Sequence, residues 1–269
     1  MNESSDHITP YRIFALVFFV MFLWGINVVM IKYLTNFLPP TALAGIRLSI
    51  AAATLIPIAQ YRYGSYKVPR KAWPPIFGVA AFSIVLHQLA LSWGITITSS
   101  THAVLILGLN PLVTTIVASR LVNEPLNWTK SIGIVLGLSG VLLIVGPNLD
   151  GSPLTLVGDG LVVIAMLTYV AGSLFVKKST AYVPPLLVTA YSHGIAAVCL
   201  VGTGMITDTN WSIPGVAIGP WPIAVLVVSG AINTGLGALW WNIGIHRIGA
   251  SMASLFLNLI PVFGMFTSS

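Results

Sequence analysis

The chain has 269 residues, of which 56% are hydrophobic and 7% are charged, and its formal net charge is +6. Soluble globular domains carry about 25% charged residues, so this composition excludes that class and indicates a polytopic membrane protein. In such a protein an excess of basic residues reflects orientation in the bilayer. We therefore expect no nucleic-acid partner.

Nine apolar stretches are long enough, at about 20 residues each, to cross a bilayer as helices. They lie at roughly 13–33, 40–59, 73–93, 101–121, 128–146, 158–176, 185–206, 221–244 and 251–267. The first stretch is too long for the apolar core of a cleavable signal peptide, so it is expected to remain as the first helix. Cys199 is the single cysteine, which leaves no partner for an intramolecular disulfide.

The basic residues gather on one side when the loops are assigned alternately to the two faces of the membrane. That side holds Arg12, Arg62, Lys67, Arg70, Lys71, Arg120, Lys130, Lys177, Lys178 and Arg247. Lys32 flanks the opposite side, and Arg47 lies within the second stretch. Because the more basic side is normally cytoplasmic, we expect a multi-pass plasma-membrane protein with a cytoplasmic N-terminus.

The second half of the chain repeats the first. An offset of 145 residues aligns Lys32, Thr35, Pro39 and Pro40 with Lys177, Thr180, Pro184 and Pro185. An offset of 150 residues aligns Gly94, Ala103, Leu105, Leu107 and Pro111 with Gly244, Ala253, Leu255, Leu257 and Pro261. Stretches one to four match stretches six to nine, so the repeating unit has five helices, and an odd number inverts the second copy.

The expected fold is therefore an all-α polytopic membrane protein made of two inverted repeats of five transmembrane helices. The first repeat covers 11–145 and the second covers 156–269. The fifth stretch has no counterpart before Ser269, so we expect a tenth helix to be missing from this chain.

Several of these residues also resemble a known family. They are Trp24, Gly25 and Asn27, then Lys32, Pro39 and Arg47, the 103–111 segment, and the run Asn123, Glu124 and Pro125. In order and spacing they look like an EamA-type member of the drug/metabolite transporter superfamily. The resemblance covers nearly the whole chain and implies a ten-helix exporter or exchanger of small organic metabolites, such as amino acids, nucleobases or drugs. Tyr169 departs from it, because it stands where the second repeat would carry the equivalent of Trp24.

Polar side chains within the stretches predict a substrate cavity, because polar groups in hydrocarbon are costly unless they face the bundle interior. At helical spacing they form four stripes, on the first, third, eighth and ninth helices. The predicted cavity residues are Trp24, Asn27, His87, Gln88, Asn110, Tyr169, Asn233, Trp240 and Asn258. The alternative is that these groups only bond neighbouring helices. For His87, Gln88 and Trp240 we favour the ligand site, while His102 and His193 stay open between the two.

Four further residues have predicted roles. Arg47 is either a gate or a contact for a substrate anion, or a structural residue that snorkels to loop carbonyls, and we favour the structural role. Pro111 and Pro261 occupy equivalent mid-helix positions, where paired kinks would serve as hinges or as static bends. Glu124 precedes the fifth helix and is expected to cap it.

No enzyme is expected. The run Gly137 to Gly140 matches the G-x-S-G of rhomboid proteases, but with Gly133 it better fits close helix packing, and a protease would leave the repeat unexplained. We expect a secondary transporter without cofactors or metal, which exports or exchanges small organic metabolites by alternating access through a central cavity between inverted repeats. A proton, carried by His87, or a second solute would be its counter-substrate, and it would be a monomer or weak dimer. The alternative is a passive facilitator or channel for small solutes, because the stretches hold no Asp or Glu to carry a proton.

Overall fold

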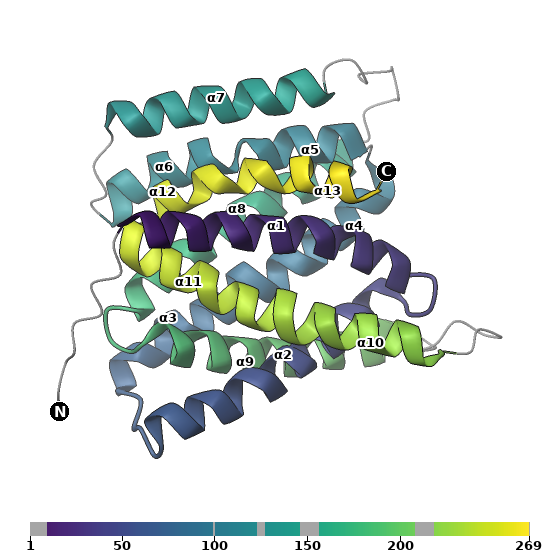
Figure 1. Cartoon of the computed structure of the whole chain (residues 1–269), viewed down its shortest axis with the longest axis vertical. Coiled ribbons are helices and arrows are strands. Elements are labelled where there is room, and N and C mark those ends of the chain that lie inside the picture. The colour runs from purple at the N-terminus through teal and green to yellow at the C-terminus, as the bar shows by residue number, and fades with distance from the viewer. Residues whose placement is uncertain (1–9, 99, 123–126, 146–155, 208–217, 269) are drawn as a thin grey trace.

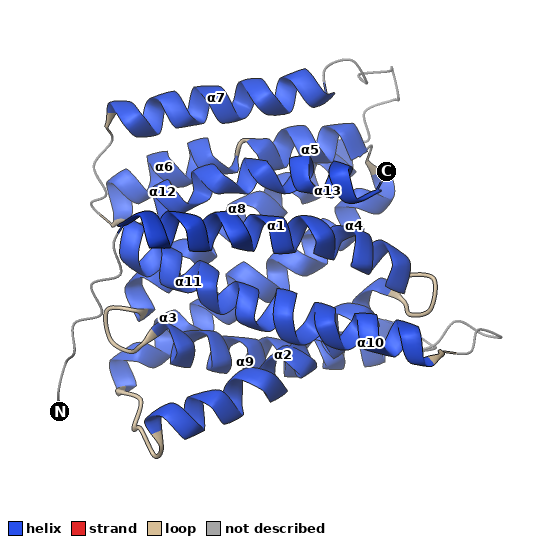
Figure 2. Cartoon of the chain, in the orientation of Figure 1, coloured by secondary structure: helices blue, strands red, loops and turns tan. Residues whose placement is uncertain are grey.

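The computed structural model describes residues 10–98, 100–122, 127–145, 156–207 and 218–268. Within these ranges every secondary-structure element is a helix, which confirms the predicted all-α fold (Figure 1; Figure 2). The run from Asn123 to Pro125, with the predicted cap Glu124, lies outside the described residues.

Each predicted apolar stretch falls on one helix or on a chain of short helices. The first repeat contains α1 (Pro10–Leu34), α2 (Pro40–Tyr63), η1 (Arg70–Ala72), α3 (Trp73–Gly78), η2 (Val79–Leu86), α4 (His87–Ile97), α5 (Ser100–Gly108), α6 (Asn110–Leu121) and α7 (Trp128–Val145). The second repeat contains α8 (Leu156–Ser179), α9 (Pro185–Thr207), α10 (Pro220–Val228), η4 (Ser229–Leu236), α11 (Gly237–Ile248), α12 (Ala250–Ser254), η5 (Leu255–Leu259) and α13 (Ile260–Ser268).

Proline and glycine mark several helix ends. Pro40, Pro185 and Pro220 begin α2, α9 and α10, where the fixed φ of proline suits the first turn and its missing N–H costs no hydrogen bond. The helices α2 and α11 end at Gly64 and Gly249, whose φ angles are +56° and +87°. A residue without Cβ adopts this left-handed conformation at little cost.

The two repeats are inverted relative to each other, as the odd number of helices predicted. The equivalent helices α2 and α9 pack along one another. A Cβ placed on Gly45, near the start of α2, would lie 3.1 Å from Val201, near the end of α9. Further along α2, Ile56 lies 3.6 Å from the Cβ position of Gly194. The paired helices therefore run in opposite directions.

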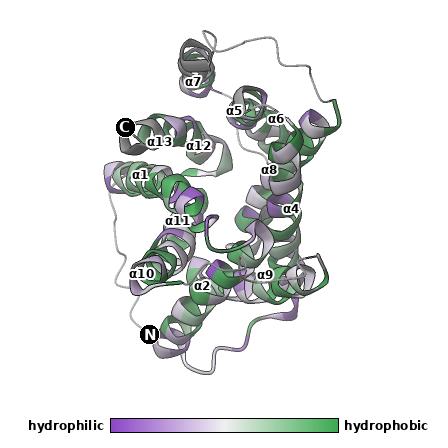
Figure 3. Cartoon of the chain, turned by 90° about the vertical axis from the view of Figure 1, so that its right-hand side faces the viewer, coloured by the Kyte–Doolittle hydropathy of each residue, from purple (hydrophilic) through white to green (hydrophobic). Residues whose placement is uncertain are grey.

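The first helix of each repeat packs into the other repeat. Helix α1 lies against α10, α11 and α13, and helix α8 lies against α3, η2 and α4 (Figure 3). Small residues permit both approaches, because a Cβ on Gly244 would lie 2.6 Å from Val17 and one on Gly94 would lie 2.9 Å from Val162. Each repeat thus completes the packing of the other.

Matching distortions interrupt the long helices. The π-helical segments η2 and η4 are separated by the same 150 residues that relate the two halves. Helix α5 ends at Gly108 and α6 begins at Asn110, directly before Pro111. In the second repeat, the 3₁₀ segment η5 and the first residue of α13 precede Pro261. Proline lacks the N–H needed for a continuous helix, which accounts for both interruptions.

Seven helices of the described chain are long and apolar enough to cross a membrane, and a shorter apolar helix covers Ala250–Gly264. Large apolar side chains such as Phe18, Ile164 and Val198 are exposed on the outer surface of the bundle. In water such a surface would promote association, whereas in a bilayer it contacts lipid. The chain is therefore a multi-pass membrane protein.

Candidate functional site

A cavity of about 410 Å³ lies between the two repeats. Both halves line it, through the composite helices η2–α4 and η4–α11 and through α1, α2, α8 and α9. Its polar and aromatic lining residues are Trp24, Asn27, Arg47, Ser83, His87, Gln88, Asn110, Tyr169, His193, Asn233, Thr234, Trp241, Asn242 and Asn258. The other lining residues are apolar, apart from a glycine, so the cavity has the few polar groups and apolar walls of a small-molecule site.

The cavity brings together most of the residues that the sequence predicted. These are Trp24, Asn27, Arg47, His87, Gln88, Asn110, Tyr169, Asn233, Asn258 and Pro261. Pro111 is buried beside the cavity-lining Asn110 and does not line the cavity itself.

Trp240 does not line the cavity, and its place is taken by Trp241. The ring of Trp240 packs instead against Phe19 of α1, with ring centroids 5.9 Å apart. A regular α-helix would put Asn233 and Trp240 on one face, seven residues apart. Asn233 lies within the π-helical segment η4, where each hydrogen bond spans one more residue than in an α-helix, so the cavity face moves on by one residue.

On the second-repeat side, helix α1 is bonded to the π-helical segment. Trp24 Nε1 donates a hydrogen bond to the carbonyl of Asn233 at 3.1 Å. Ser229 Oγ donates to Asn27 Oδ1 at 2.6 Å. These bonds join neighbouring helices, which is the structural role that the sequence left as the alternative, while both residues also line the cavity.

On the first-repeat side, His87 bonds helix α8. Its Nδ1 lies 2.9 Å from the carbonyl of Ala165 and donates to it, because a carbonyl oxygen only accepts. The imidazole also packs on the ring of Tyr169, with centroids 5.0 Å apart. Tyr169 and Trp24 are equivalent in the repeat, and Gly237 stands where the first repeat has His87. Trp24 Nε1 accordingly lies 3.0 Å from the Cβ position of Gly237.

Within the described part of the chain, Arg47 is the single Lys or Arg residue that lines the cavity, and it is 7% exposed. Its Nη2 donates a hydrogen bond to Thr234 Oγ1 at 2.7 Å. Thr234 Oγ1 in turn donates to the carbonyl of Ser229 at 2.8 Å. Arg47 thus bonds a side chain of the opposite repeat, whereas the predicted structural role required a loop carbonyl.

Three buried polar atoms of this cavity lack hydrogen-bond partners among the described residues. They are Arg47 Nε, the hydroxyl of Tyr169 and Asn233 Oδ1. A buried polar group without a partner costs about 1–3 kcal/mol. The three residues line the cavity, but these atoms themselves are covered, so a ligand would reach them only when the side chains around them shift.

Three polar or aromatic lining residues were not predicted from sequence, namely Thr234, Trp241 and Asn242. Together with Ala238 they lie at positions i, i+4, i+7 and i+8, a helical stripe that begins one residue after Asn233. His193, which the sequence left open, also lines the cavity. Its Nδ1 donates to the carbonyl of Thr189 at 2.9 Å, and Asn242 Nδ2 donates to Thr189 Oγ1 at 2.9 Å.

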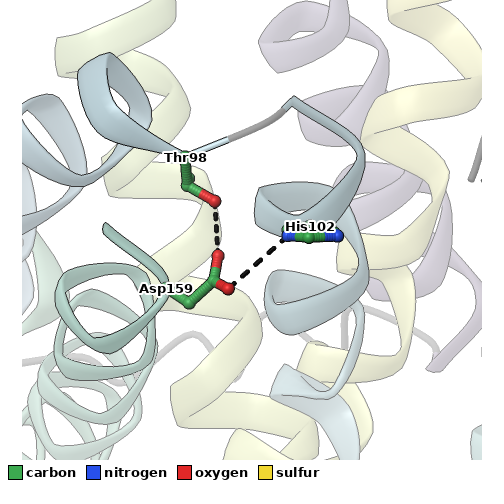
Figure 4. Close-up of polar contacts among 3 residues, drawn as sticks. All are labelled: Thr98, His102 and Asp159. Carbon is green, nitrogen blue, oxygen red and sulfur yellow. Dashed lines mark hydrogen bonds and ion pairs between the residues drawn. The ribbon is translucent and has the colours of Figure 1, made fainter. Parts of the chain in front are cut away.

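A second polar cluster lies where α4, α5 and α8 meet at their ends (Figure 4). Thr98 Oγ1 donates a hydrogen bond to Asp159 Oδ1. His102 Nδ1 lies 3.5 Å from Asp159 Oδ2. Since Asp159 is in the first turn of α8, the positive end of the helix dipole also stabilises its carboxylate. The cluster ties the connection between α4 and α5 to the other repeat.

Among the residues that the structure describes, no group of three or more His, Cys, Asp or Glu side chains is placed to hold a metal ion.

Both halves of the chain match the same family of known proteins. The model of the EamA-like transporter family matches residues 12–146 and again 156–269. The chain is 32% identical over 245 residues to the uncharacterized transporter YyaM of Bacillus subtilis, which spans 88% of this chain and 78% of that protein. It is 26% identical over 179 residues to a probable amino-acid metabolite efflux pump of Escherichia coli, which spans 61% of this chain and 53% of that protein.

The fold also matches a solved crystal structure. The two chains superpose with a TM-score of 0.80 at 17% sequence identity, over 96% of this chain and 88% of the other.

Proposed function

This chain belongs to the EamA-like transporter family, and from that membership we propose that it is a secondary transporter that exports or exchanges small organic metabolites. The observation that carries the proposal is the cavity of about 410 Å³ between the inverted repeats. Ligand sites of small molecules occupy about 300–1,000 Å³, and inverted-repeat transporters bind substrate where their halves meet.

Alternating access is the mechanism that this architecture favours. Two inverted halves can rock about a fixed site and open it to either face of the membrane. The interruptions before Pro111 and Pro261 supply one flexible point in each half, and in this proposal both prolines are hinges. The cavity residues would then contact substrate in both states.

The charges and the relatives support the direction and the setting that we propose for transport. Export is supported by the relative named as a probable efflux pump. The clustered basic residues favour the plasma membrane with a cytoplasmic N-terminus. A monomer suffices, since both halves of the cavity come from one chain, and the counter-substrate is a proton or a second solute.

Solute counterflow tests the proposal. Purified protein is reconstituted into liposomes that are preloaded with an unlabelled amino acid, nucleobase or drug-like solute, and uptake of the same labelled solute is measured. Preloading should accelerate uptake relative to unloaded proteoliposomes, because a carrier returns faster with a bound substrate. Protein-free liposomes are the control. Equal uptake with and without preloading would instead identify a passive facilitator or channel.

A further inference from the structure

We propose that the cavity selects solutes that carry one carboxylate, and that Arg47 binds this carboxylate. The inference rests on the proposed transport function, since it names the substrate class of the same cavity. The guanidinium of Arg47 stays protonated in proteins and prefers planar oxyanions as partners.

The positive charge of Arg47 is not balanced within the described chain. The sequence has six acidic residues. Of these, only Asp159 lies in the described ranges, and it bonds Thr98 at the ends of the helices. Among the residues that the structure describes, no Asp or Glu lines the cavity. A buried charge is costly unless an opposite charge and hydrogen bonds compensate it.

Two covered, unpartnered atoms of cavity-lining residues indicate which groups of a solute would satisfy them once the side chains around them shift. Arg47 Nε can only donate a hydrogen bond, so it requires an acceptor such as a carboxylate oxygen. Asn233 Oδ1 can only accept, so it requires a donor. Asn233 adjoins Thr234, the residue to which Arg47 is bonded. A carboxylate with a neighbouring hydroxyl or amino group satisfies both atoms.

The other residues that line the cavity limit which groups the solute can carry beyond its carboxylate. Trp24 and Trp241 line the cavity with their rings 5.5 Å apart, and half of the other lining residues are apolar. An apolar or aromatic remainder therefore fits this wall. A cationic solute finds no carboxylate here and would meet the repulsion of Arg47.

The test compares three probes in binding to the purified full chain by calorimetry: phenyllactate, its uncharged amide phenyllactamide, and hydrocinnamate, which has the carboxylate without the hydroxyl. Phenyllactate should bind about tenfold or more tightly than phenyllactamide, as a charge-assisted hydrogen bond implies. Hydrocinnamate should bind with intermediate affinity, because it leaves Asn233 Oδ1 without a donor.

Two variants test, independently of each other, whether Arg47 binds the carboxylate. Arg47→Gln removes the charge. Asn233→Asp keeps the size of the side chain and supplies a carboxylate on the cavity-lining residue next to Thr234, to which Arg47 is bonded, so it remains informative if Arg47→Gln fails to fold. Both variants should abolish the preference for phenyllactate over phenyllactamide. The matched control is Arg120→Gln, which removes an exposed basic residue at the end of α6 and should leave the preference unchanged.

The outcomes separate the inference from the proposed function. If phenyllactamide binds as tightly as phenyllactate, or if the preference survives in both Arg47→Gln and Asn233→Asp, the carboxylate site is wrong, whatever the transport result. Counterflow of phenyllactate into proteoliposomes then tests transport on its own. An Arg47-dependent preference without accelerated counterflow would support the carboxylate site and overturn the carrier.

Discussion

Gly172 of α8 lies directly against Ser83 in the π-helical segment of the first repeat. A Cβ placed on Gly172 would lie 2.5 Å from Ser83 Cα and 2.6 Å from Ser83 N. These are backbone atoms, so no rotation of a side chain could relieve the contact. Helix α8 can therefore approach this wall of the cavity so closely only because Gly172 has no Cβ.

Gly172→Ala should destabilise the protein by about 1–3 kcal/mol, because overpacking forces the two backbones apart. Gly160 on the same helix gives a matched control, since a Cβ there would meet nothing within 4 Å. Thermal unfolding in detergent should show a lower Tm for Gly172→Ala and no loss for Gly160→Ala. Equal Tm values for the two variants would mean that α8 does not approach η2 this closely.

The two adjacent tryptophans should differ in their effect on substrate. Trp241 lines the cavity, whereas Trp240 packs against Phe19. Trp241→Phe should weaken the apparent affinity for a transported solute by about two- to tenfold, the contribution of an aromatic contact. Trp240→Phe should leave it unchanged. Saturation curves for counterflow measure the apparent affinity of each variant. A larger effect at Trp240 would mean that Trp240 faces the cavity, as a regular α-helix predicts.

His87 should contribute through its bond to Ala165. Asparagine can place an amide N–H near the position of Nδ1, so His87→Asn should keep more transport than His87→Ala. Neither variant can titrate near neutral pH, so both should lose the pH dependence of flux if His87 carries the proton. Initial rates of counterflow across the neutral pH range measure both effects. A pH profile that is unchanged in both variants would assign the titration to another group.

The orientation can be tested with single cysteines in a Cys199→Ser background. Asn36 and Ser65 are both exposed and lie in the loops on either side of α2. A membrane-impermeant thiol reagent should label Asn36→Cys in intact cells and label Ser65→Cys only after permeabilisation. The reverse pattern would place the N-terminus outside.

The sequence predicted the helices and the inverted repeat because both depend on features that extend over many residues. Apolar length locates a membrane helix whatever its neighbours are, and a duplication is visible at any distance. Most of the residues predicted for the substrate cavity line the pocket between the repeats, because polar groups in a membrane helix must face inward.

The rotation of the eighth predicted helix could not be predicted. A regular α-helical spacing favoured Trp240, whereas the π-helical turn at Ser229–Leu236 brings Trp241 to the cavity. No residue type in that segment requires a π-helix. The hydrogen bond between Arg47 and Thr234 could not be predicted from the sequence either, because it joins residues 187 positions apart.

The exchange of first helices between the repeats has a consequence for biosynthesis. Helix α1 leaves the ribosome well before the helices that it packs against, α10, α11 and α13. Its internal hydrogen bonds allow it to wait in the bilayer as a single helix. Its tertiary contacts can form only when translation has passed the second repeat, so neither half-gene expressed alone should yield a stably folded half.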